Sequence, residues 1–299
     1  MTTSPSRSAT DLTTGFRCSV SSRVDDEEMA GTAPTETAYL FVEYPGAWGR
    51  KAVAESRLPG EVIAHLESLA GVRVQLVRRH GGLVEGGTRV FAASLGAGSG
   101  GATVTTTVLD DVAELIDLGP ADLQPYAGPL WLVCTNGRRD LCCAESGRPV
   151  ATALAHRWPE ATWETTHLGG HRFAGTLLAL PSGATLGRLD PHTAVEACRE
   201  LEQGRLPIDL ARGIGGRAGA AQVAELHVRR ELGLVGLADV ATEAREASAD
   251  GERVVVRAGA ERYEVTVRAT PGEPRRQSCA DLTTKPAQVY AVTGWVRLP

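Results

Sequence analysis

The sequence predicts an α/β fold of two consecutive units, followed by a small antiparallel β extension. Runs with the hydrophobic spacing of strands alternate with runs that have the spacing of helices, as is typical of layered α/β domains. A connection rich in Gly and Pro separates the two units at residues 119–129, and only strand-like runs remain after residue 252. The 299 residues suffice for about two domains of ordinary size.

The first unit is expected over residues 37–118. The segment Tyr39–Glu43 predicts a strand, and Arg57–Ala70 carries apolar residues at helical spacing, with Pro59 in the first turn and Gly71 just past the end. Alternating β-branched residues predict three further strands, at Val72–Val77, Arg89–Leu95 and Thr103–Leu109, and a short helix follows at Asp110–Asp117. Residues 96–101 match G-x-G-x-x-G, but a strand rather than a helix follows, so we expect a hairpin turn.

The second unit is expected over residues 129–238. Its predicted elements are a buried strand at 130–134, a helix at about 148–157, a strand at 161–166, a hairpin turning at 181–183 and a helix at Thr193–Gln203. This β-α-β-β-α order is that of the thioredoxin fold, and the first unit is a weaker version of it. The fold prediction is therefore two thioredoxin-like units in tandem.

Polar segments flank these units. Residues 1–36 are rich in Ser, Thr and charge, which predicts a flexible N-terminal arm, and the polar residues 239–251 are expected to be mobile. Three alternating runs at 253–257, 263–268 and 289–298 predict a small antiparallel sheet within a C-terminal extension, 252–299.

Composition excludes several classes of function. The net charge of −5 gives no bulk attraction to nucleic acid or to an anionic membrane, and no apolar run reaches the roughly 20 residues that cross a bilayer. The N-terminus lacks the apolar core of a secretory signal. Six cysteines are too few and too unevenly spaced for a disulfide framework. We therefore expect a cytoplasmic protein that binds neither nucleic acid nor membrane.

Cysteine and histidine concentrate in one stretch, from Cys134 to Gly175. Cys134 ends the apolar strand, and Cys142 and Cys143 follow a polar loop, near a helix start. His167 and His171 follow the next strand. The spacings C-x8-C and H-x3-H let two thiolates and two imidazoles converge from neighbouring loops, which predicts a metal or iron-sulfur site.

The spacing of the cysteines bears on the metal. Structural zinc usually takes its cysteines from C-x2-4-C knuckles, and eight intervening residues are too many for a knuckle. A 2Fe-2S cluster is wider than one zinc ion and can be held from well-separated loops, so we favour it over zinc. Cys143 would lie near a helix N-terminus, which stabilises negative charge. Cys142 remains an alternative to Cys143 as the second thiolate.

The strings VCTNGRRDLCC and HLGGHRFAG are similar to the signature of the sucrase/ferredoxin-like family. Further similarity lies in FRCS at 16–19, VEYPGAWG at 42–49 and GRL at 187–189, and the likeness extends to about residue 240. It implies a thioredoxin-like fold and a 2Fe-2S cluster with ligation like that of a Rieske centre. Transferred by motif, the ligands are Cys134, Cys143, His167 and His171. The family name does not imply sucrose hydrolysis, because no carboxylate pair for glycosidase chemistry stands out.

These observations predict an electron-transfer protein, more a redox carrier than a catalyst with its own substrate. Its partner would be a reductase or oxidase, and an exposed imidazole N–H would couple the electron to a proton. Two alternatives remain. One is a metal-free thioredoxin-like thiol oxidoreductase, although the C-x-x-C motif is missing. The other is an interaction module stabilised by zinc.

Four arginines flank the expected ligands, namely Arg138, Arg139, Arg148 and Arg172. They are either solvated loop charge or a patch that steers an acidic partner. Of the other cysteines, we expect Cys18 to be packed and inert and Cys279 to be a bystander.

Overall fold

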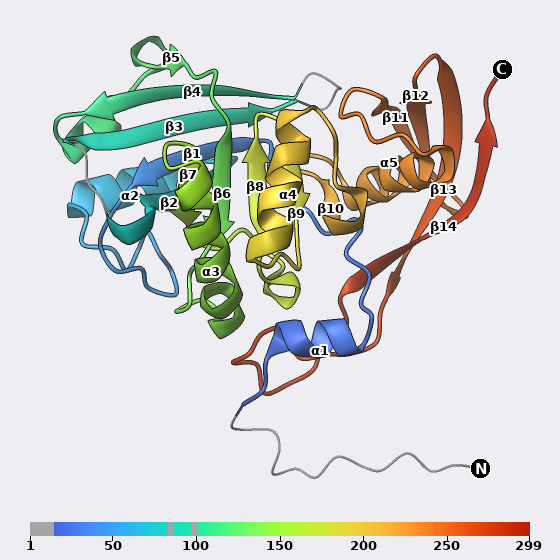
Figure 1. Ribbon diagram of the computed structural model, residues 1–299, viewed down its shortest axis with the longest axis horizontal. Helices are drawn as coiled ribbons and strands as arrows, with labels where there is room; N and C mark the ends of the chain where they lie inside the picture. Colours follow the sequence, from blue (N-terminus) through green and yellow to red (C-terminus); the bar gives the residue numbers. More distant parts are fainter. Residues whose placement is uncertain (1–14, 83–85, 97–100) are drawn as a thin grey trace.

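The computed structural model describes residues 15–82, 86–96 and 101–299. It shows an α/β protein with one large curled sheet and a separate four-stranded sheet near the C-terminus (Figure 1). The large sheet has the strand order β10-β9-β8-β6-β7-β2-β1-β3-β4-β5. The central turn residues of the G-x-G-x-x-G match, 97–100, lie outside the described residues, but the strands on either side pair as an antiparallel hairpin.

The first half of the sheet follows the sequence prediction closely. Helix α2, Gly60–Ser68, begins directly after Pro59 and ends before Gly71, whose φ of 73° is left-handed. The expected helix after β4 is a 3-10 helix, η3, Val112–Ile116, capped by Asp111. The strands are β1 Ala38–Glu43, β2 Val72–Arg79, β3 Thr88–Leu95, β4 Ala102–Leu109 and the short β5 Gln124–Pro125.

The second half contains the remaining strands and two long helices. These elements are β6 Leu130–Cys134, α3 Leu141–Arg157, β7 Thr162–Thr165, β8 Leu177–Leu180, β9 Ala184–Leu186, α4 Pro191–Glu202 and β10 Ala211–Ile214. Helix α3 begins well before the expected residue 148, because the Asp140 side chain accepts the N–H of Cys142 at 3.0 Å and caps it there. Pro149 therefore lies inside the helix instead of in its first turn.

Strands from both expected units lie in the same sheet. β7 pairs with β2 in antiparallel orientation, and this pairing joins the two halves edge to edge. The division into two thioredoxin-like units stays a prediction.

The sheet is strongly curled. β3 and β7 are three strand positions apart, so a flat sheet would separate them by about 14 Å. The rings of Phe91 in β3 and Trp163 in β7 nevertheless meet edge to face, with centroids 5.4 Å apart. The inner face of the curl thus packs against itself, and its buried residues include Tyr39, Phe41, Leu130, Leu132 and Cys134.

Helices cover the other face. On β6, Trp131 and Val133 point away from the inner face and pack with Val150 and Leu154 of α3. On β1, Val42 does the same against α2. Figure 1 shows α3 and α4 lying side by side across β6 to β9. Cys134, at the end of β6, faces the inner side and is 1% exposed.

The C-terminal part forms the expected small antiparallel sheet. Its strands are β11 Val240–Ser248, β12 Gly251–Ala258, β13 Glu261–Pro271 and β14 Gln288–Arg297, with α5 Gly219–Leu232 packed against it. Our expectation of a mobile 239–251 is wrong, because β11 pairs along its whole length with β12. Backbone hydrogen bonds to β12 hold this segment in the sheet, although its exposed side chains are polar.

The described part of the N-terminal segment is folded onto the rest of the chain. Helix α1, Cys18–Val24, lies beside the loop between β13 and β14, at the lower edge of the molecule in Figure 1. Cys18 is fully buried, and Met29 and Ala30 are also buried. Residues 1–14 of the expected flexible arm lie outside the described residues.

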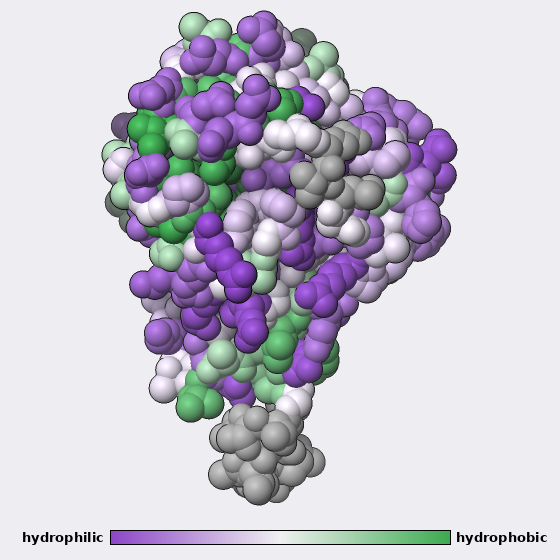
Figure 2. Space-filling model, turned by 90° about the vertical axis from the view of Figure 1, so that its left-hand side faces the viewer, coloured by the Kyte–Doolittle hydropathy of each residue, from purple (hydrophilic) through white to green (hydrophobic). Residues whose placement is uncertain are grey.

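The side of the molecule that carries α2 is largely hydrophilic, with apolar surface in its upper part and again toward its lower end (Figure 2). Among the described residues, no helix combines the length and the hydropathy that a bilayer crossing requires.

Candidate metal centre

Two parallel strands bring the first cysteine and the first histidine together. β6 and β7 pair in parallel, with Cys134 opposite Thr165. Cys134 is the last residue of β6, and His167 follows two residues after β7 ends. Because the carboxyl ends of parallel strands meet at the same edge of a sheet, both side chains emerge into the same crevice.

The first turn of α3 separates the two adjacent cysteines. Consecutive helical residues project about 100° apart, so Cys142 and Cys143 face different neighbours. The Sγ of Cys143 lies 3.8 Å from Nδ1 of His167, whereas the Sγ of Cys142 lies 3.3 Å from the Sγ of Cys279. Cys143 therefore lies with Cys134 and His167, whereas Cys142 lies against Cys279.

Three of the four expected ligands form a compact group. The Sγ of Cys134 is 3.9 Å from Nδ1 of His167, and the ligand atoms of Cys134, Cys143 and His167 all lie within 4.8 Å of one another. A tetrahedral metal with Zn–S near 2.3 Å and Zn–N near 2.0 Å would separate such atoms by about 3.5 Å. Both cysteines are buried and His167 is half-buried, so the group opens toward solvent on its histidine side.

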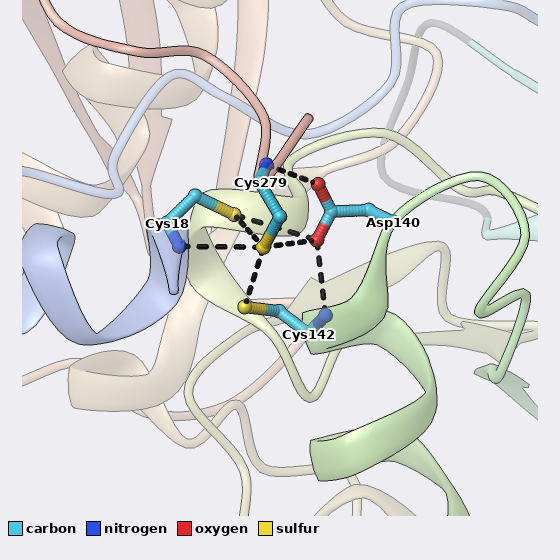
Figure 3. A group of neighbouring side chains, drawn as sticks. All are labelled: Cys18, Asp140, Cys142 and Cys279. Carbon is cyan, nitrogen blue, oxygen red and sulfur yellow. Dashed lines mark hydrogen bonds between the residues drawn. The ribbon is translucent and has the colours of Figure 1, made fainter. Parts of the chain in front are cut away.

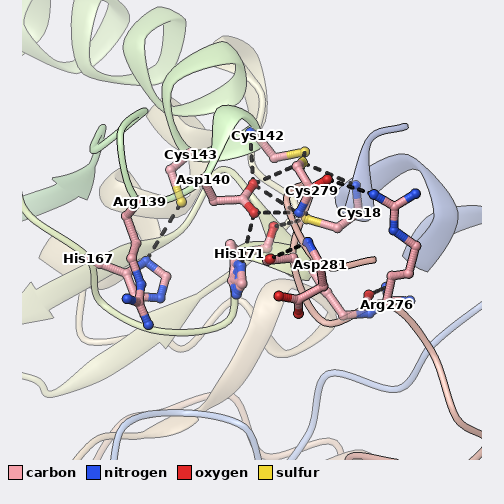
Figure 4. A network of polar contacts seen from close by, with 12 residues as sticks. Cys18, Arg139, Asp140, Cys142, Cys143, His167, His171, Arg276, Cys279 and Asp281 are labelled. Atoms are coloured by element: carbon pink, nitrogen blue, oxygen red, sulfur yellow. Dashed lines mark hydrogen bonds and ion pairs between the residues drawn. The ribbon is translucent and has the colours of Figure 1, made fainter. Parts of the chain in front are cut away.

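His171 stands beside this group without belonging to it. Its ring centroid is 5.0 Å from that of His167, and its Nδ1 lies 3.3 Å from Oδ2 of Asp140 (Figure 4). The other ring nitrogen of His171, Nε2, can then bind a metal. A carboxylate on the second nitrogen is the usual support of a metal-binding histidine.

The loop between the histidines requires glycine and a buried arginine. Gly169 and Gly170 have φ values of 87° and 68°. Arg212 donates from Nη1 to the carbonyl of Gly169 at 3.1 Å, and a Cβ on Gly170 would lie 2.3 Å from its Nη2. Arg73 and Gln75 of β2 donate to the carbonyl of His167, at 2.7 and 3.2 Å. Three side chains thus hold the loop through hydrogen bonds to its carbonyl groups.

Burial and charge perturb the ionisable groups of the site. Cys143 donates its thiol proton toward Cys134, which holds the pKa of Cys134 well below and that of Cys143 well above the usual range. Burial lowers the pKa of His171, against the opposing effect of Asp140. Burial also lowers the pKa of Arg212 to about 10, so it remains a cation at neutral pH near the two thiols.

Comparison with known proteins identifies the family. The model of the sucrase/ferredoxin-like family matches residues 29–213. The chain belongs to this family. No curated protein and no solved structure matches it. The residues that the resemblance implied as ligands, Cys134, Cys143, His167 and His171, all lie inside the matched region of this sucrase/ferredoxin-like chain.

A second group of metal-ligating side chains lies next to the first, and sequence reasoning missed it. It consists of Cys18, Asp140, Cys142 and Cys279 (Figure 3). Hydrogen bonds from Cys18 and Cys279 lower the pKa of Cys142 to about 2. Cys18 and Cys279 lie outside the family match, and nothing in their spacing relates them to Cys142. The similarity of FRCS at 16–19 to family members is the one sequence signal that points to a functional role for Cys18.

A basic pocket is lined by two members of the second group, and by Thr135 and Ala144, the sequence neighbours of Cys134 and Cys143. Its volume is about 740 Å³, and its lining includes Trp48, Asn136, Asp140 and Cys279 together with five arginines, namely Arg50, Arg78, Arg138, Arg139 and Arg148. Arg172, the fourth arginine expected in a surface patch, is instead 4% exposed and bound to Glu27 at 2.6 Å. It supports the fold and does not belong to the patch.

The first group can hold a metal. Thiolate and imidazole are donors that suit both zinc and an iron-sulfur cluster. Its three close ligand atoms could surround a single ion, and the neighbouring His171 provides a fourth donor for a wider group. The geometry alone is compatible with either.

Proposed function

We propose that this protein carries single electrons on a 2Fe-2S cluster held by Cys134, Cys143, His167 and His171. The supporting observation is the convergence of two buried thiols and the His167 imidazole within 4.8 Å, with His171 beside them, in a member of a family with ferredoxin in its description. When bound, the cluster would accept and release one electron, which no side chain here does alone.

The chain supplies ligands, orientation and charge. Cys134 and Cys143 would bind as thiolates, and the buried Arg212 offsets part of their negative charge. The carbonyl contacts from Arg73 and Gln75 hold His167, and Asp140 orients His171 through Nδ1. Both histidines are therefore fixed by a neighbour before the cluster binds, which reduces the ordering cost of binding.

The histidine side of the site is the proposed route for electrons. His171 has a side chain that is 16% exposed, whereas Cys134 is 1% exposed. Arg138 and Arg148, exposed on the adjoining pocket, would attract an acidic redox partner, a reductase or an oxidase. The cytoplasmic location expected from the cysteine content is part of the same proposal.

A zinc-stabilised interaction module is the second candidate, because three ligand atoms at this spacing can also surround one zinc ion. The metal-free thiol oxidoreductase has less support. Burial of Cys134 and Cys143 at 1% exposure each leaves little access for a substrate disulfide.

Anaerobic purification followed by analysis of iron, acid-labile sulfide and zinc separates the three. We expect two irons and two sulfides per chain, a visible absorption spectrum, and an EPR signal on reduction. Colourless protein that lacks iron even after anaerobic reconstitution with iron and sulfide would overturn the proposal. Zinc lost on replacing Cys134 would then support the structural site.

A further inference from the structure

We propose that Cys18, Cys142, Cys279 and Asp140 form a second metal site that binds one Zn²⁺ ion. This site is separate from the cluster of the proposed function and uses none of its ligands. Its donors come from α1, the first turn of α3, and the loop between β13 and β14 (Figure 3).

The four donor atoms have the spacing of a tetrahedral zinc shell. With Zn–S near 2.3 Å and Zn–O near 2.0 Å, sulfur ligands lie about 3.8 Å apart and a sulfur and an oxygen about 3.5 Å apart. The Sγ of Cys279 is 3.3 Å from that of Cys142 and 3.6 Å from that of Cys18. Oδ1 of Asp140 is 3.1 Å from the Sγ of Cys279 and 3.5 Å from that of Cys18. The other two pairs of donor atoms lie within 4.8 Å, so small shifts of the side chains would centre an ion among the four.

The chemistry of the donors selects the ion. Three sulfurs with one carboxylate oxygen suit zinc and disfavour calcium or magnesium, which take oxygen ligands. The donor atoms all lie within 4.8 Å of one another, a size that fits one ion. As ligands all three cysteines would be thiolates, and a cation would compensate this buried negative charge, which is costly when unpaired.

The surroundings are built like those of a structural site. Cys18 is 0% exposed and Cys142 is 2% exposed, and Phe16 and Ala174 pack against them. Asp140 is oriented by two backbone donors, the N–H of Cys142 to Oδ1 at 3.0 Å and the N–H of Cys279 to Oδ2 at 2.8 Å. The N–H of Cys18 points to the Sγ of Cys279 at 3.5 Å, an orientation that suits a thiolate ligand.

An entry path and nearby positive charge complete the site. Cys279 and Asp140 line the basic pocket, so an ion can reach them from solvent. Arg276 donates to the carbonyl of Cys279 at 2.8 Å, and its guanidinium lies over the ring of Phe16, 4.0 Å from the centroid. This arginine lies beside a site whose three thiolates and carboxylate exceed the charge of Zn²⁺ by two.

The ion would link α1 and the loop between β13 and β14 to α3, the helix that carries Cys143. Cys18 and Cys279 are separated by 261 positions in the sequence, and their side chains lie next to each other beside Cys142 in the first turn of α3 (Figure 3). A closed zinc site contributes directly to folding stability, because its ligands are not assembled in the unfolded chain.

The test is metal analysis of the full-length protein produced with added Zn²⁺, as wild type and as Cys18→Ser, Cys279→Ser and Cys198→Ser. Cys198 is the matched control, a fully buried cysteine of α4 that packs in the core. We expect Cys18→Ser and Cys279→Ser each to contain one zinc per chain fewer than wild type, with unchanged iron. Cys198→Ser should match wild type.

Because the readout is a difference in zinc at Cys279, it does not depend on what the Cys134 site holds. A lack of iron would bear on the electron carrier, and a lack of this zinc difference would bear on the second site. Equal zinc in wild type and Cys279→Ser would overturn the inference. So would a mass of unreduced wild type lower by two hydrogens, with Cys142 joined to Cys279, since a disulfide consumes two of the ligands.

Co²⁺ provides a second measurement on wild type, in case the variants fold poorly. Addition of Co²⁺ to protein treated with a chelator should produce a thiolate-to-cobalt charge-transfer band and the visible bands of tetrahedral cobalt. Cys134→Ser should retain this spectrum, because it leaves the second site intact. Loss of the whole spectrum in folded Cys134→Ser would show that no ion binds at Cys18, Cys142 and Cys279.

Discussion

Asp140 contacts the imidazole of His171 through Oδ2 and the sulfur of Cys279 through Oδ1. Its Oδ2 lies 3.3 Å from Nδ1 of His171, and its Oδ1 lies 3.1 Å from the Sγ of Cys279 (Figure 4). A single carboxylate therefore contacts the proposed cluster ligand His171, belongs to the second group and caps α3 through the N–H of Cys142.

Asp140→Asn should weaken both sites while leaving the helix in place. Asn caps helices about as well as Asp, but it loses the charge and one of the two acceptor oxygens. Loss of a carboxylate that supports a metal ligand typically lowers metal affinity by about 10–100-fold. We expect reduced zinc and a cluster lost faster to a chelator, measured by metal analysis and absorbance. Asp190→Asn makes the same exchange at the cap of α4 and should have no effect on either metal.

The two adjacent cysteines should behave differently on substitution. Cys134→Ala and Cys143→Ala should each abolish the 2Fe-2S cluster, because each removes a thiolate from the group around His167. Cys142→Ala should keep the iron, as should Cys18→Ala, Cys198→Ala and Cys279→Ala. Iron and sulfide content is the measurement. A full cluster in Cys143→Ala and none in Cys142→Ala would reverse the assignment.

The potential of the proposed cluster should fall as pH rises. Adding an electron makes the cluster more negative, so a ligand imidazole holds its proton more tightly when reduced, and its pKa is higher in that state. Between the two pKa values, the potential should drop by about 59 mV per pH unit for one proton per electron. His167→Cys or His171→Cys should lower the potential and weaken this slope, since a thiolate adds negative charge. The measurement is a redox titration of the wild type from about pH 6 to 10. A potential that does not change with pH would rule out proton coupling.

The two glycines of the histidine loop should differ in their tolerance of a side chain. Gly169→Ala meets no atom within 4 Å, so its cost is that of a left-handed alanine, about 1–2 kcal/mol. Gly170→Ala adds a collision with the guanidinium of Arg212, which is buried and hydrogen-bonded to Thr32 and to the carbonyl of Gly169. We expect a greater loss of unfolding free energy and lower iron retention for Gly170→Ala, measured by urea unfolding and metal analysis. Equal losses of unfolding free energy in the two variants would show that the side chain of Arg212 moves to make room.

Charge on the basic pocket should control how fast a redox partner binds. Reversing Arg138 and Arg139 to Glu should slow electron exchange with an acidic partner and weaken its dependence on salt. Arg57→Glu, on an exposed position outside the pocket lining, is the control. Rates measured at low and high ionic strength that do not differ would exclude electrostatic steering.

The sequence predicted the parts of the fold that depend on local pattern. The first four strands, the helix after Pro59 and the C-terminal sheet were found near their expected positions, because alternation, helical spacing and turn residues act within a few residues. The antiparallel pairing of β7 with β2 was not predicted, since strand order depends on contacts across the curl, such as Phe91 with Trp163.

The candidate site divides in the same way. The C-x8-C and H-x3-H spacings pointed to Cys134, Cys143 and His167, which lie at the ends of consecutive elements. The start of α3 was misplaced because the cap at Asp140 was overlooked, and with it the separation of Cys142 from Cys143. The sequence predicts no role for Cys279, because no local pattern shows that it meets Asp140 across 139 positions of sequence.

The positions of the donors along the chain imply an order of assembly during synthesis. The expected cluster ligands lie between residues 134 and 171, so they leave the ribosome as one short segment and can meet once β6, α3 and β7 have formed. Cys279 follows only after β13. A newly made chain can therefore gather the four expected cluster ligands first, whereas the proposed zinc site at Cys18, Cys142 and Cys279 can close only after β13 has been made.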